Sequence, residues 1–398
     1  MKPNPLEVSI LSRTQGRSIK EYQLEKIQET LRLVSANSPY YKSKYQGYDI
    51  GAIKSLEDFG KLPFMSAEDL TLFGPKMLCV PQNEIERIVT LQTSGTVGEP
   101  KRLYFTAADQ ELAIEFFHVG IGCLVDQKDN FMILLPYKIP GMVGDLLEKG
   151  LKRFGCGVYP YGLIESYQDA AEFMLENNIT SLVGNPVQVL KLAEFTKLRG
   201  MNLKLTSVLL ATDYVPDVIA QRVAALWQCQ AFEHYAMTEM YYGGGVYCEH
   251  LAGYHVFEAD LYFEIISDQG QSLPDGEYGE IVFTTLTRNG MPLIRYRTGD
   301  YGRFKNERCD CSSKLRLMDK VRRRVAGGTV IGGREFYMSD FDEMFFSCDK
   351  VVDYKLAVNN GELNVKIMTV DDIAEQDASP ERLTKRKIIS GGENETDD

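Results

Sequence analysis

Short apolar runs alternate with segments of helix-type periodicity between residues 131 and 240, and this alternation constrains the fold more than any other feature. Each run has the length and apolar content of a buried strand, and each intervening segment is long enough for a helix. A strand–helix–strand order is typical of βαβ units, so we predict an α/β fold with a mostly parallel sheet covered by helices on both faces. The apolar runs are 131–135, 157–159, 181–183 and 208–210, and the helical segments are 167–176, 186–199 and 217–228.

A loop rich in glycine and hydroxyl groups, TSGTVGEPK at 93–101, comes before this region. Glycines let the backbone approach an anion closely, so that N–H groups, hydroxyls and the lysine can cradle a phosphate. The loop is not a Walker A sequence, because its glycines are too close together and a strand is predicted at 102–105. An ordinary turn is the alternative for a Gly/Ser/Thr stretch. The candidate phosphate-binding residues are Thr93, Ser94, Gly95, Thr96, Gly98 and Lys101.

Two segments lie directly after predicted strands of the parallel sheet, where the ligands of open α/β sheets bind. The first is Ala211-Thr212-Asp213, for which a plain strand end is the alternative. The second is HYAMTE at 234–239. Its Glu239 offers oxygen to a hard cation such as Mg²⁺, and Thr238 offers a hydroxyl to phosphates or to the metal. A helix start is the alternative for an isolated Thr-Glu pair.

The hydrophobic pattern changes to period two beyond residue 250, with turn signals between the segments. This pattern predicts an antiparallel β subdomain with strands at 262–266, 279–283 and 293–296. The last strand carries YRTGD at 296–300. A carboxylate held at the end of a strand can accept hydrogen bonds from both hydroxyls of a ribose, so Asp300 is the candidate for that role.

These motifs, in this order and spacing, resemble those of the AMP-forming acyl-CoA synthetases, the adenylate-forming enzymes, and in particular their phenylacetate-CoA ligase-like branch. The resemblance implies that the loop at 93–101 binds the phosphates of ATP and that 211–213 contacts the adenine ring. It also implies that Tyr235 to Glu239 form the family's Y-G-x-T-E motif, with Ala236 in place of glycine. ATP, Mg²⁺ and CoA are the cofactors and co-substrates that follow from it.

After Leu317 the sequence pattern becomes that of a small α+β unit of about eighty residues, near the lower end of domain size. The resemblance implies a large N-terminal adenylate-forming domain at 1–317, with parallel sheets, helices and the antiparallel β subdomain. It further implies a small, mobile α+β C-terminal domain at 318–398 with a disordered tail.

Two basic residues in this C-terminal region match functional positions of the family. Arg324 matches the hinge arginine that reaches the ribose, although Arg323 replaces the family's glycine, and a solvated edge is the alternative. Lys385 matches the lysine that bridges acid and phosphate during adenylation. Thr384 stands in place of the family's glycine before this lysine, and Lys387 is the alternative match for the lysine.

Three cysteines and a histidine, Cys248, His255, Cys309 and Cys311, form a second group of candidate ligands. A Cys₃His set suits a closed structural Zn²⁺ site, which would hold the β subdomain in place and take no part in the chemistry. The C-x-C spacing is tighter than usual, and His250 competes with His255. Relatives among the phenylacetate-CoA ligase-like proteins place Cys and His at similar points. Reduced cysteines in a loop are the alternative.

The net charge of −12 over 398 residues disfavours nonspecific binding to nucleic acid or to an anionic membrane. The N-terminus lacks the apolar core of a signal peptide, and no run approaches the ~20 apolar residues of a membrane span. We therefore expect a cytoplasmic protein whose partners are a small carboxylic acid, ATP and CoA. The sequence carries no signal for an oligomeric state, and a homodimer stays open.

Together these residues predict an ATP-dependent, AMP-forming acid:CoA ligase that acts through an acyl-adenylate on an aryl or small organic acid. Lys385, Thr238 and Glu239 would take part in catalysis, and YYGGG at 241–245 would form a flexible, aromatic-lined wall for the acyl group. One alternative is an adenylyltransferase that modifies a small molecule or a deazaflavin cofactor without CoA. Another is a nucleotide-binding regulator that has lost catalysis, which the altered hinge motivates.

Overall fold

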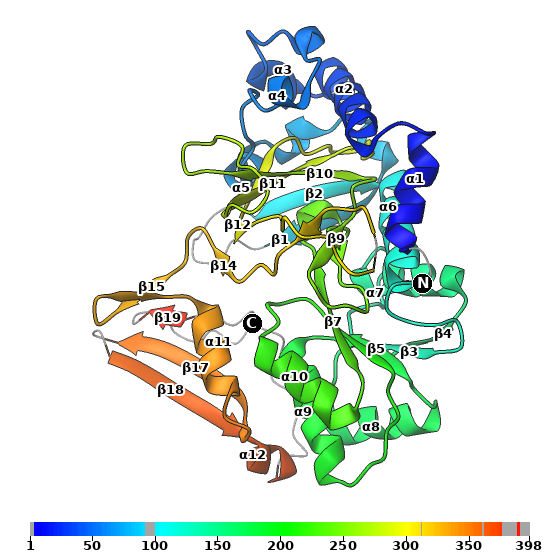
Figure 1. Ribbon diagram of the computed structural model, residues 1–398, viewed down its shortest axis with the longest axis vertical. Helices are drawn as coiled ribbons and strands as arrows, with labels where there is room; N and C mark the ends of the chain where they lie inside the picture. The colour runs from blue at the N-terminus through cyan, green and yellow to red at the C-terminus, as the bar shows by residue number, and fades with distance from the viewer. Residues whose placement is uncertain (1–3, 92–99, 312, 360–361, 376–387, 391–398) are drawn as a thin grey trace. The chain divides into compact units, whose positions relative to one another are not determined.

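The computed structural model describes residues 4–91, 100–311, 313–359, 362–375 and 388–390. Its helices and strands form the mixed α/β fold that the sequence predicts, with parallel and antiparallel sheets (Figure 1). None of the helices within these ranges is both long and apolar enough to cross a membrane. The chain divides into two compact units. Unit 1 comprises Met1–Cys123, Ile139–Phe154 and Tyr235–Val321, and unit 2 comprises Leu124–Lys138, Gly155–His234 and Arg322–Asp398.

Unit 2 contains a parallel sheet with the strand order β4-β3-β5-β6-β7. Every residue of β5 and β6 is buried, as expected for strands that are covered on both faces. The strands β3, β4, β5 and β6 coincide with apolar runs that the sequence predicts as strands. β7 coincides with the run that precedes the predicted site at 234–239. The strands are β3 (Asn130–Ile133), β4 (Gly157–Pro160), β5 (Ser181–Gly184), β6 (Ser207–Leu210) and β7 (Gln230–Tyr235).

The predicted helices between these strands are confirmed, and local capping explains where they begin. The Ser166 hydroxyl accepts a hydrogen bond from the backbone of Asp169 at 3.1 Å, which begins the first helix. The Asn185 side chain accepts from the backbone of Val187 at 3.0 Å, and Pro186 occupies the first helical position after it. The helices are α8 (Tyr167–Glu176), α9 (Pro186–Leu198) and α10 (Asp217–Trp227).

The C-terminal part of unit 2 is the predicted α+β region, in which β17 pairs with β18 antiparallel and with β19 parallel. In Figure 1, α11 lies against this sheet. Its elements are β14 (Arg323–Arg324), β15 (Thr329–Ile331), β16 (Arg334–Phe336), α11 (Met338–Phe346), β17 (Val351–Asn359), β18 (Glu362–Thr369), α12 (Val370–Glu375) and β19 (Ile388–Ser390).

This α+β region shares a hydrophobic core with α9 and α10 of the same unit. Arg222 of α10 joins the two parts, because it donates to Glu194 Oε1 at 2.6 Å and to the Val351 carbonyl at 2.6 Å. Glu343 of α11 accepts from the backbone N–H of Asp217 at 2.7 Å, at the first turn of α10. A rotation of the C-terminal region would have to break these contacts. Its mobility and its predicted boundary at residues 317 and 318 stay predictions.

Unit 1 is built around an antiparallel sheet in which β10 pairs with β11 and β11 with β12, beside the hairpin of β1 and β2. The prediction of a third strand at 293–296 is wrong, because that strand begins only at Tyr296. Arg295, directly before it, has a φ of 50° and turns a buried side chain inward, which breaks the extended backbone. The strands are β1 (Ile85–Leu91), β2 (Lys101–Thr106), β8 (Gly245–Val246), β9 (Tyr254–Val256), β10 (Leu261–Ile266), β11 (Gly279–Thr285), β12 (Tyr296–Gly302) and β13 (Leu317–Met318).

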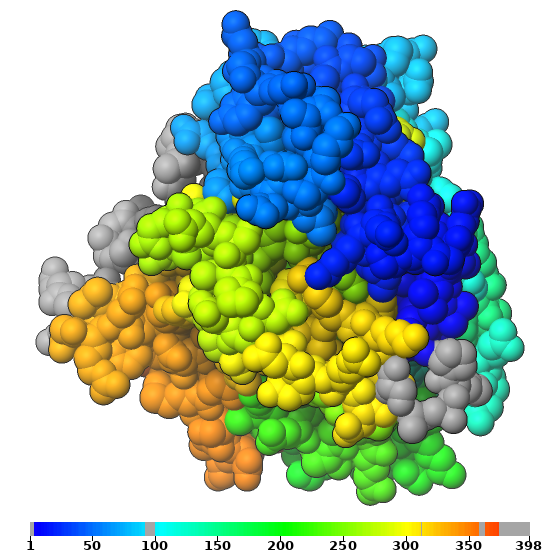
Figure 2. Space-filling view, turned by 45° about the horizontal axis from the view of Figure 1, so that its top comes forward, coloured from blue at the N-terminus to red at the C-terminus, as the bar shows by residue number. Residues whose placement is uncertain are grey.

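Helices from the first third of the chain cover this sheet and its loops. Tyr22 in the second helix donates to the Ala259 carbonyl at 3.0 Å, just before β10. Figure 2 shows the loop after β12, in yellow, beside the first helix, in dark blue, and the Lys314 N–H donates to Glu7 Oε2 at 3.1 Å. The helices of unit 1, including two from later in the chain, are α1 (Pro5–Thr14), α2 (Ile19–Asn37), α3 (Pro39–Lys44), η1 (Ile50–Ala52), α4 (Leu56–Phe59), α5 (Ala67–Phe73), η2 (Gly74–Met77), η3 (Gln82–Glu84), α6 (Ala107–Ile121), α7 (Val143–Phe154) and η4 (Thr238–Met240).

Candidate active site

A buried carboxylate joins three segments of unit 1 that lie far apart in the sequence. Glu239 is 3% exposed and sits in η4, directly after β7. Its Oε1 accepts a hydrogen bond from the ammonium of Lys101, at the start of β2. The same oxygen accepts from the hydroxyl of Tyr296, at the start of β12, at 3.0 Å. Neither donor uses Oε2, which has no hydrogen-bond partner among the described residues. The lysine of the phosphate loop and the glutamate of the T-E motif therefore meet at one carboxylate oxygen.

A second pair of predicted site residues also comes together in unit 1. The hydroxyl of Tyr235, at the end of β7, donates to Asp300 Oδ2 at 3.0 Å. The Asp300 N–H donates to the Thr298 hydroxyl at 2.9 Å, so the residue is oriented from its backbone as well. Tyr235 is buried, whereas Asp300 is half-buried. This arrangement holds an acidic side chain in one direction while leaving part of it accessible to solvent.

The position of Asp300 differs from the prediction in one respect, because it lies inside β12 and not at a strand end. The pairing of β11 with β12 shifts register between Glu280 and Val282, which makes an irregular stretch opposite the motif. Gly299 has a φ of 73° there, and its N–H donates to Glu280 Oε1 at 3.1 Å. A bulge therefore redirects the Asp300 side chain, and the glycine of the motif supplies the left-handed backbone that the bulge needs.

The segment after Thr238 and Glu239 is packed, so the prediction of a flexible wall at 241–245 is wrong. Tyr241 has a φ of 55°, is 3% exposed and stacks on Phe105 with 3.7 Å between ring centroids. A Cβ at Gly244 would lie 2.2 Å from the Tyr235 carbonyl oxygen. The glycine is therefore required by close backbone approach and does not indicate mobility. A left-handed tyrosine beside a predicted site is uncommon, and such strain clusters at functional sites.

The other predicted nucleotide-binding residues lie in unit 2 or outside the described ranges. Ala211 is buried at the end of β6, and the exposed Thr212 after it has a φ of 80°. Asp213 accepts from the Tyr214 N–H at 2.8 Å. Arg324 is exposed on β14. The residues outside the described ranges are Thr93, Ser94, Gly95, Thr96, Gly98, Lys385 and Lys387.

The predicted Cys₃His set converges at one point of unit 1, with its four ligand atoms within 4.8 Å of one another. The sulfur atoms of Cys248 and Cys309 are 3.5 Å apart, and Cys311 Sγ is 3.4 Å from His255 Nε2. A tetrahedron with 2.3 Å metal–sulfur bonds has edges of about 3.8 Å, close to these distances. The histidine in this group is His255 on β9, and the alternative His250 is outside it.

The protonation of this group also suits a metal. Burial lowers the pKa of His255 to about 4, so the imidazole is neutral, which is the form that binds a metal. Burial raises the pKa of the Cys248 and Cys311 thiols, and a bound cation would reverse this shift, because the thiolate is the form that binds a metal. None of the chain's cysteines forms a disulfide in the described ranges. The donor set therefore fits a tetrahedral Zn²⁺ ion.

Comparison with known proteins agrees with the motifs and their placement. No protein-family model matches the chain. The phenylacetate-coenzyme A ligase of Thermus thermophilus is 26% identical over 359 residues, which cover 87% of this chain and 78% of that protein. The phenylacetate-coenzyme A ligase of Escherichia coli K12 is 25% identical over 377 residues, 90% of this chain and 82% of that protein. The chain is therefore similar to phenylacetate-CoA ligases over most of its length.

Solved structures show the same fold at lower identity. A 2-hydroxyisobutyryl-CoA ligase in the postadenylation state, in complex with 2-HIB-AMP, has a TM-score of 0.77 and 17% identity, and the match covers 95% of this chain and 87% of that one. The O-succinylbenzoate coenzyme A synthetase of Bacillus subtilis, in complex with AMP, has a TM-score of 0.50 and 19% identity over 75% of this chain and 63% of that one. The predicted adenylate-forming fold and the resemblance to phenylacetate-CoA ligases are thereby confirmed.

Sequence reasoning missed one residue of this candidate site. Tyr296 is 1% exposed, and its hydroxyl donates to the Glu239 carboxylate, but we gave a role only to Asp300 in that motif. A signal was present, because Tyr296 is the first residue of the same YRTGD motif. A tyrosine at the start of a predicted strand is more often a core residue, and only the fold brings it to the carboxylate.

Proposed function

We propose that this chain is an ATP-dependent, AMP-forming carboxylic acid:CoA ligase that acts through an acyl-adenylate on an aryl or small organic acid. The single observation that carries the proposal is the contact of Lys101 and Tyr296 with one oxygen of the buried Glu239. The phenylacetate-CoA ligases to which the chain is similar over most of its length support the acid:CoA part of the proposal.

In this reaction a carboxylate oxygen of the acid attacks the α-phosphorus of ATP, and pyrophosphate leaves. The CoA thiolate then attacks the acyl carbon, and AMP leaves with the bridging oxygen. Lys101 would place its ammonium on the phosphates together with the loop at 93–98, and Thr238 would add a hydroxyl. Mg²⁺ held by Glu239 Oε2 would offset the negative charge of the phosphates. Lys385 would bridge acid and phosphate during adenylation.

Acid-dependent ATP–pyrophosphate exchange tests this proposal. We expect exchange only in the presence of an acid from a panel of aryl and short-chain carboxylates, since the adenylate forms reversibly from acid and ATP. Adding CoA should then release AMP and give a thioester. Exchange without thioester formation would favour an adenylyltransferase that does not use CoA. ATP binding without exchange on any acid would favour a regulator and contradict the proposal.

Asp300 is expected to bind the ribose of ATP. Replacing it by alanine should raise KM for ATP in the exchange assay by about 10- to 100-fold, the effect of losing hydrogen bonds to a charged acceptor. Asp300→Asn should raise KM less, because the amide keeps one acceptor oxygen. Asp319→Ala serves as the matched control, since Asp319 pairs with the partly exposed Arg303 of the same unit. An unchanged KM for ATP in Asp300→Ala would rule out this role.

We also propose that Cys248, His255, Cys309 and Cys311 hold a structural Zn²⁺ ion. The ion would tie β9 to the loops after β8 and β12, which carry the cysteines. A Cys₃His set leaves no open coordination position, so the site would stabilise unit 1 without taking part in acyl transfer. The neighbouring Leu317 and Ala252 pack against the cysteines and keep water from them.

Removing the metal should destabilise the protein. A ligand bound at 1,000 times its dissociation constant stabilises the native state by about 4 kcal/mol, so a strong chelator should lower the melting temperature by several degrees. Cys309→Ser should do the same and abolish zinc release, measured with a chromogenic chelator after denaturation. Cys348→Ser is the control, because Cys348 is exposed and lies outside the group. Native protein that releases no zinc, and whose melting temperature the chelator leaves unchanged, would refute the site.

A further inference from the structure

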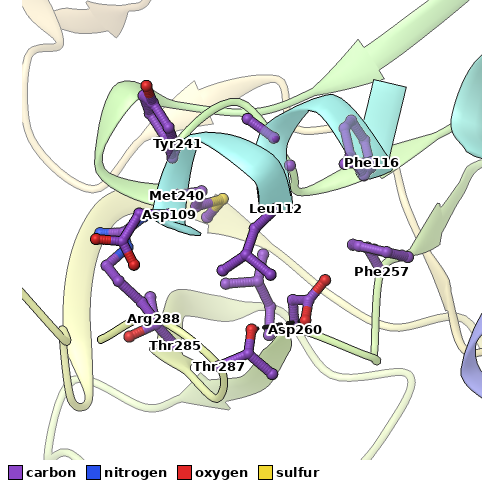
Figure 3. Close-up of a pocket in the computed structure, with 13 residues that line it drawn as sticks. Asp109, Leu112, Phe116, Met240, Tyr241, Phe257, Asp260, Thr285, Thr287 and Arg288 are labelled. Atoms are coloured by element: carbon purple, nitrogen blue, oxygen red, sulfur yellow. Dashed lines mark hydrogen bonds between the residues drawn. The ribbon is translucent and has the colours of Figure 1, made fainter. Parts of the chain in front are cut away.

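A cavity of about 30 Å³ lies in unit 1 beside the segment that follows Glu239. Its wall combines the N-terminal half of α6, the residues Met240 and Tyr241, and the segment after β11 that carries Arg288 (Figure 3). Leu112, Phe116 and Phe257 supply much of the apolar lining. The cavity therefore adjoins the candidate active site but uses none of the residues that are expected to bind ATP.

The Arg288 guanidinium is buried in this wall with one of its nitrogen atoms unpaired. Arg288 is 4% exposed, and its Nη1 is buried with no hydrogen-bond partner among the described residues. No carboxylate in those ranges lies within 4.0 Å of it, the limit for an ion pair. The guanidinium carbon lies 5.1 Å from the centroid of the Phe105 ring. A buried charge of this kind is strongly unfavourable unless it meets an acceptor.

The nearby carboxylates are already engaged elsewhere. In Figure 3 the Arg288 side chain lies beside Asp109, but Asp109 accepts from the backbone N–H groups of Thr106, Asn289 and Gly290, at 2.9, 2.9 and 3.1 Å. Burial lowers the pKa of Arg288. The nearby groups that raise this pKa are Asp109, Tyr241, Glu239 and Tyr41. An arginine keeps its proton under such conditions, so Arg288 is a charged group whose Nη1 donor is not satisfied among the described residues.

The far side of the cavity has a second unmatched polar atom. Asp260 Oδ1 accepts from Arg13 at 2.7 Å and from the Thr287 hydroxyl at 2.6 Å, whereas Oδ2 is buried and has no partner among the described residues. The Tyr241 hydroxyl is likewise buried without one. Arg288 Nη1 and the Tyr241 hydroxyl are unmet donors that an anion could satisfy, whereas Asp260 Oδ2 is an acceptor that needs a donor such as water.

We propose that Arg288 binds a carboxylate-sized anion in this cavity. A volume of about 30 Å³ has room for about two water-sized groups, which suits chloride, formate or the end carboxylate of a longer acid but excludes an aromatic ring. The anion has two sources, the solution or the distal carboxylate of the substrate acid. The second source rests on the proposed ligase function and would make the substrate a dicarboxylic acid.

Thermal unfolding of the full chain tests the site without any assay of activity. Sodium formate should raise the melting temperature of the native protein by about 2 °C at ten times its dissociation constant, and Arg288→Met should abolish this rise. Arg288→Lys, which keeps the charge but not the fork of donors, should retain a smaller rise. If Arg288→Met does not fold, bromide-soaked crystals of the native protein should show an anomalous peak beside Arg288.

Acid-dependent exchange distinguishes the two sources of the anion. If the substrate supplies it, dicarboxylates should show a lower KM than monocarboxylates of equal length, and Arg288→Met should remove that preference at least tenfold. KM for ATP should not change. If exchange occurs with no acid, the ligase function fails, but the formate result still decides the anion site. Absence of an Arg288-dependent formate effect, of a bromide peak and of any dicarboxylate preference would leave only water in the cavity and overturn the proposal.

Discussion

Replacing Glu239 by glutamine is expected to lower the rate of acid-dependent ATP–pyrophosphate exchange by about 10²- to 10³-fold, the usual effect of removing one preorganised electrostatic group. The amide cannot hold Mg²⁺ as a carboxylate does, and it binds the Lys101 ammonium more weakly, because it carries no charge. The loss should fall mainly on kcat, because these contacts act on charge that develops during the reaction. Exchange rates measured at saturating ATP and acid report this loss of kcat.

A double-mutant cycle with Lys101→Met gives this prediction its control. Because Lys101 and Glu239 are in contact, the double variant should be little worse than either single one. Glu258→Gln is a matched substitution of another buried glutamate of unit 1, paired with Arg316, and should keep near-native exchange. Exchange within threefold of native in both Glu239→Gln and Lys101→Met would show that the pair has no catalytic role.

Arg295→Met is expected to lower the free energy of unfolding by about 3–5 kcal/mol, the largest effect on stability that we predict. Arg295 is 1% exposed and donates to both oxygens of Glu264, at 3.1 and 3.0 Å, as well as to the carbonyls of Gly60 and Leu62. Removing it leaves Glu264 as an unpaired charge in the interior, and burial already raises the pKa of that carboxyl. The substitution therefore exposes the full desolvation penalty of the glutamate.

Urea unfolding followed by circular dichroism measures this effect. Arg303→Met is the matched control, since Arg303 pairs with Asp319 with 34% of its side chain exposed and should lower the free energy of unfolding far less. Arg295→Met combined with Glu264→Leu should recover part of the loss, because the unpaired charge is then gone. A single variant no less stable than Arg303→Met would refute the importance of the buried pair.

Local patterns of this chain were sufficient to predict its layers. Helices α8, α9 and α10 follow the predicted periodic segments closely, and the strands between them coincide with apolar runs. Each pattern depends on neighbours within a few residues, which is why single-sequence reasoning finds it. The strand prediction at 293–296 failed because contacts between residues far apart in the sequence decide the conformation there. Arg295 leaves the extended conformation to reach Glu264 and the carbonyls near residue 60, contacts that only the folded chain provides.

The sequence likewise predicts which residues take part in the candidate site but not which contacts they make. Lys101, Glu239 and Asp300 stand in motifs of recognisable order, so their participation is readable from the sequence. Their contacts are not, because Lys101 and Glu239 are 138 positions apart. Arg288 carried no signal at all, since a lone arginine in a turn is ordinarily exposed. Its burial becomes visible only when α6 and the segment after Glu239 close over it.

The central claim, attack of a carboxylate on the α-phosphorus of ATP, is tested most directly by an isotope label. The native chain is given ATP, CoA and an acid that supports exchange, with ¹⁸O in the carboxylate of the acid. The oxygen that attacks stays on phosphorus when the CoA thiolate displaces AMP, so AMP should gain a single ¹⁸O in each turnover while pyrophosphate gains none. AMP without the label, or label in phosphate released alongside ADP, would contradict the account.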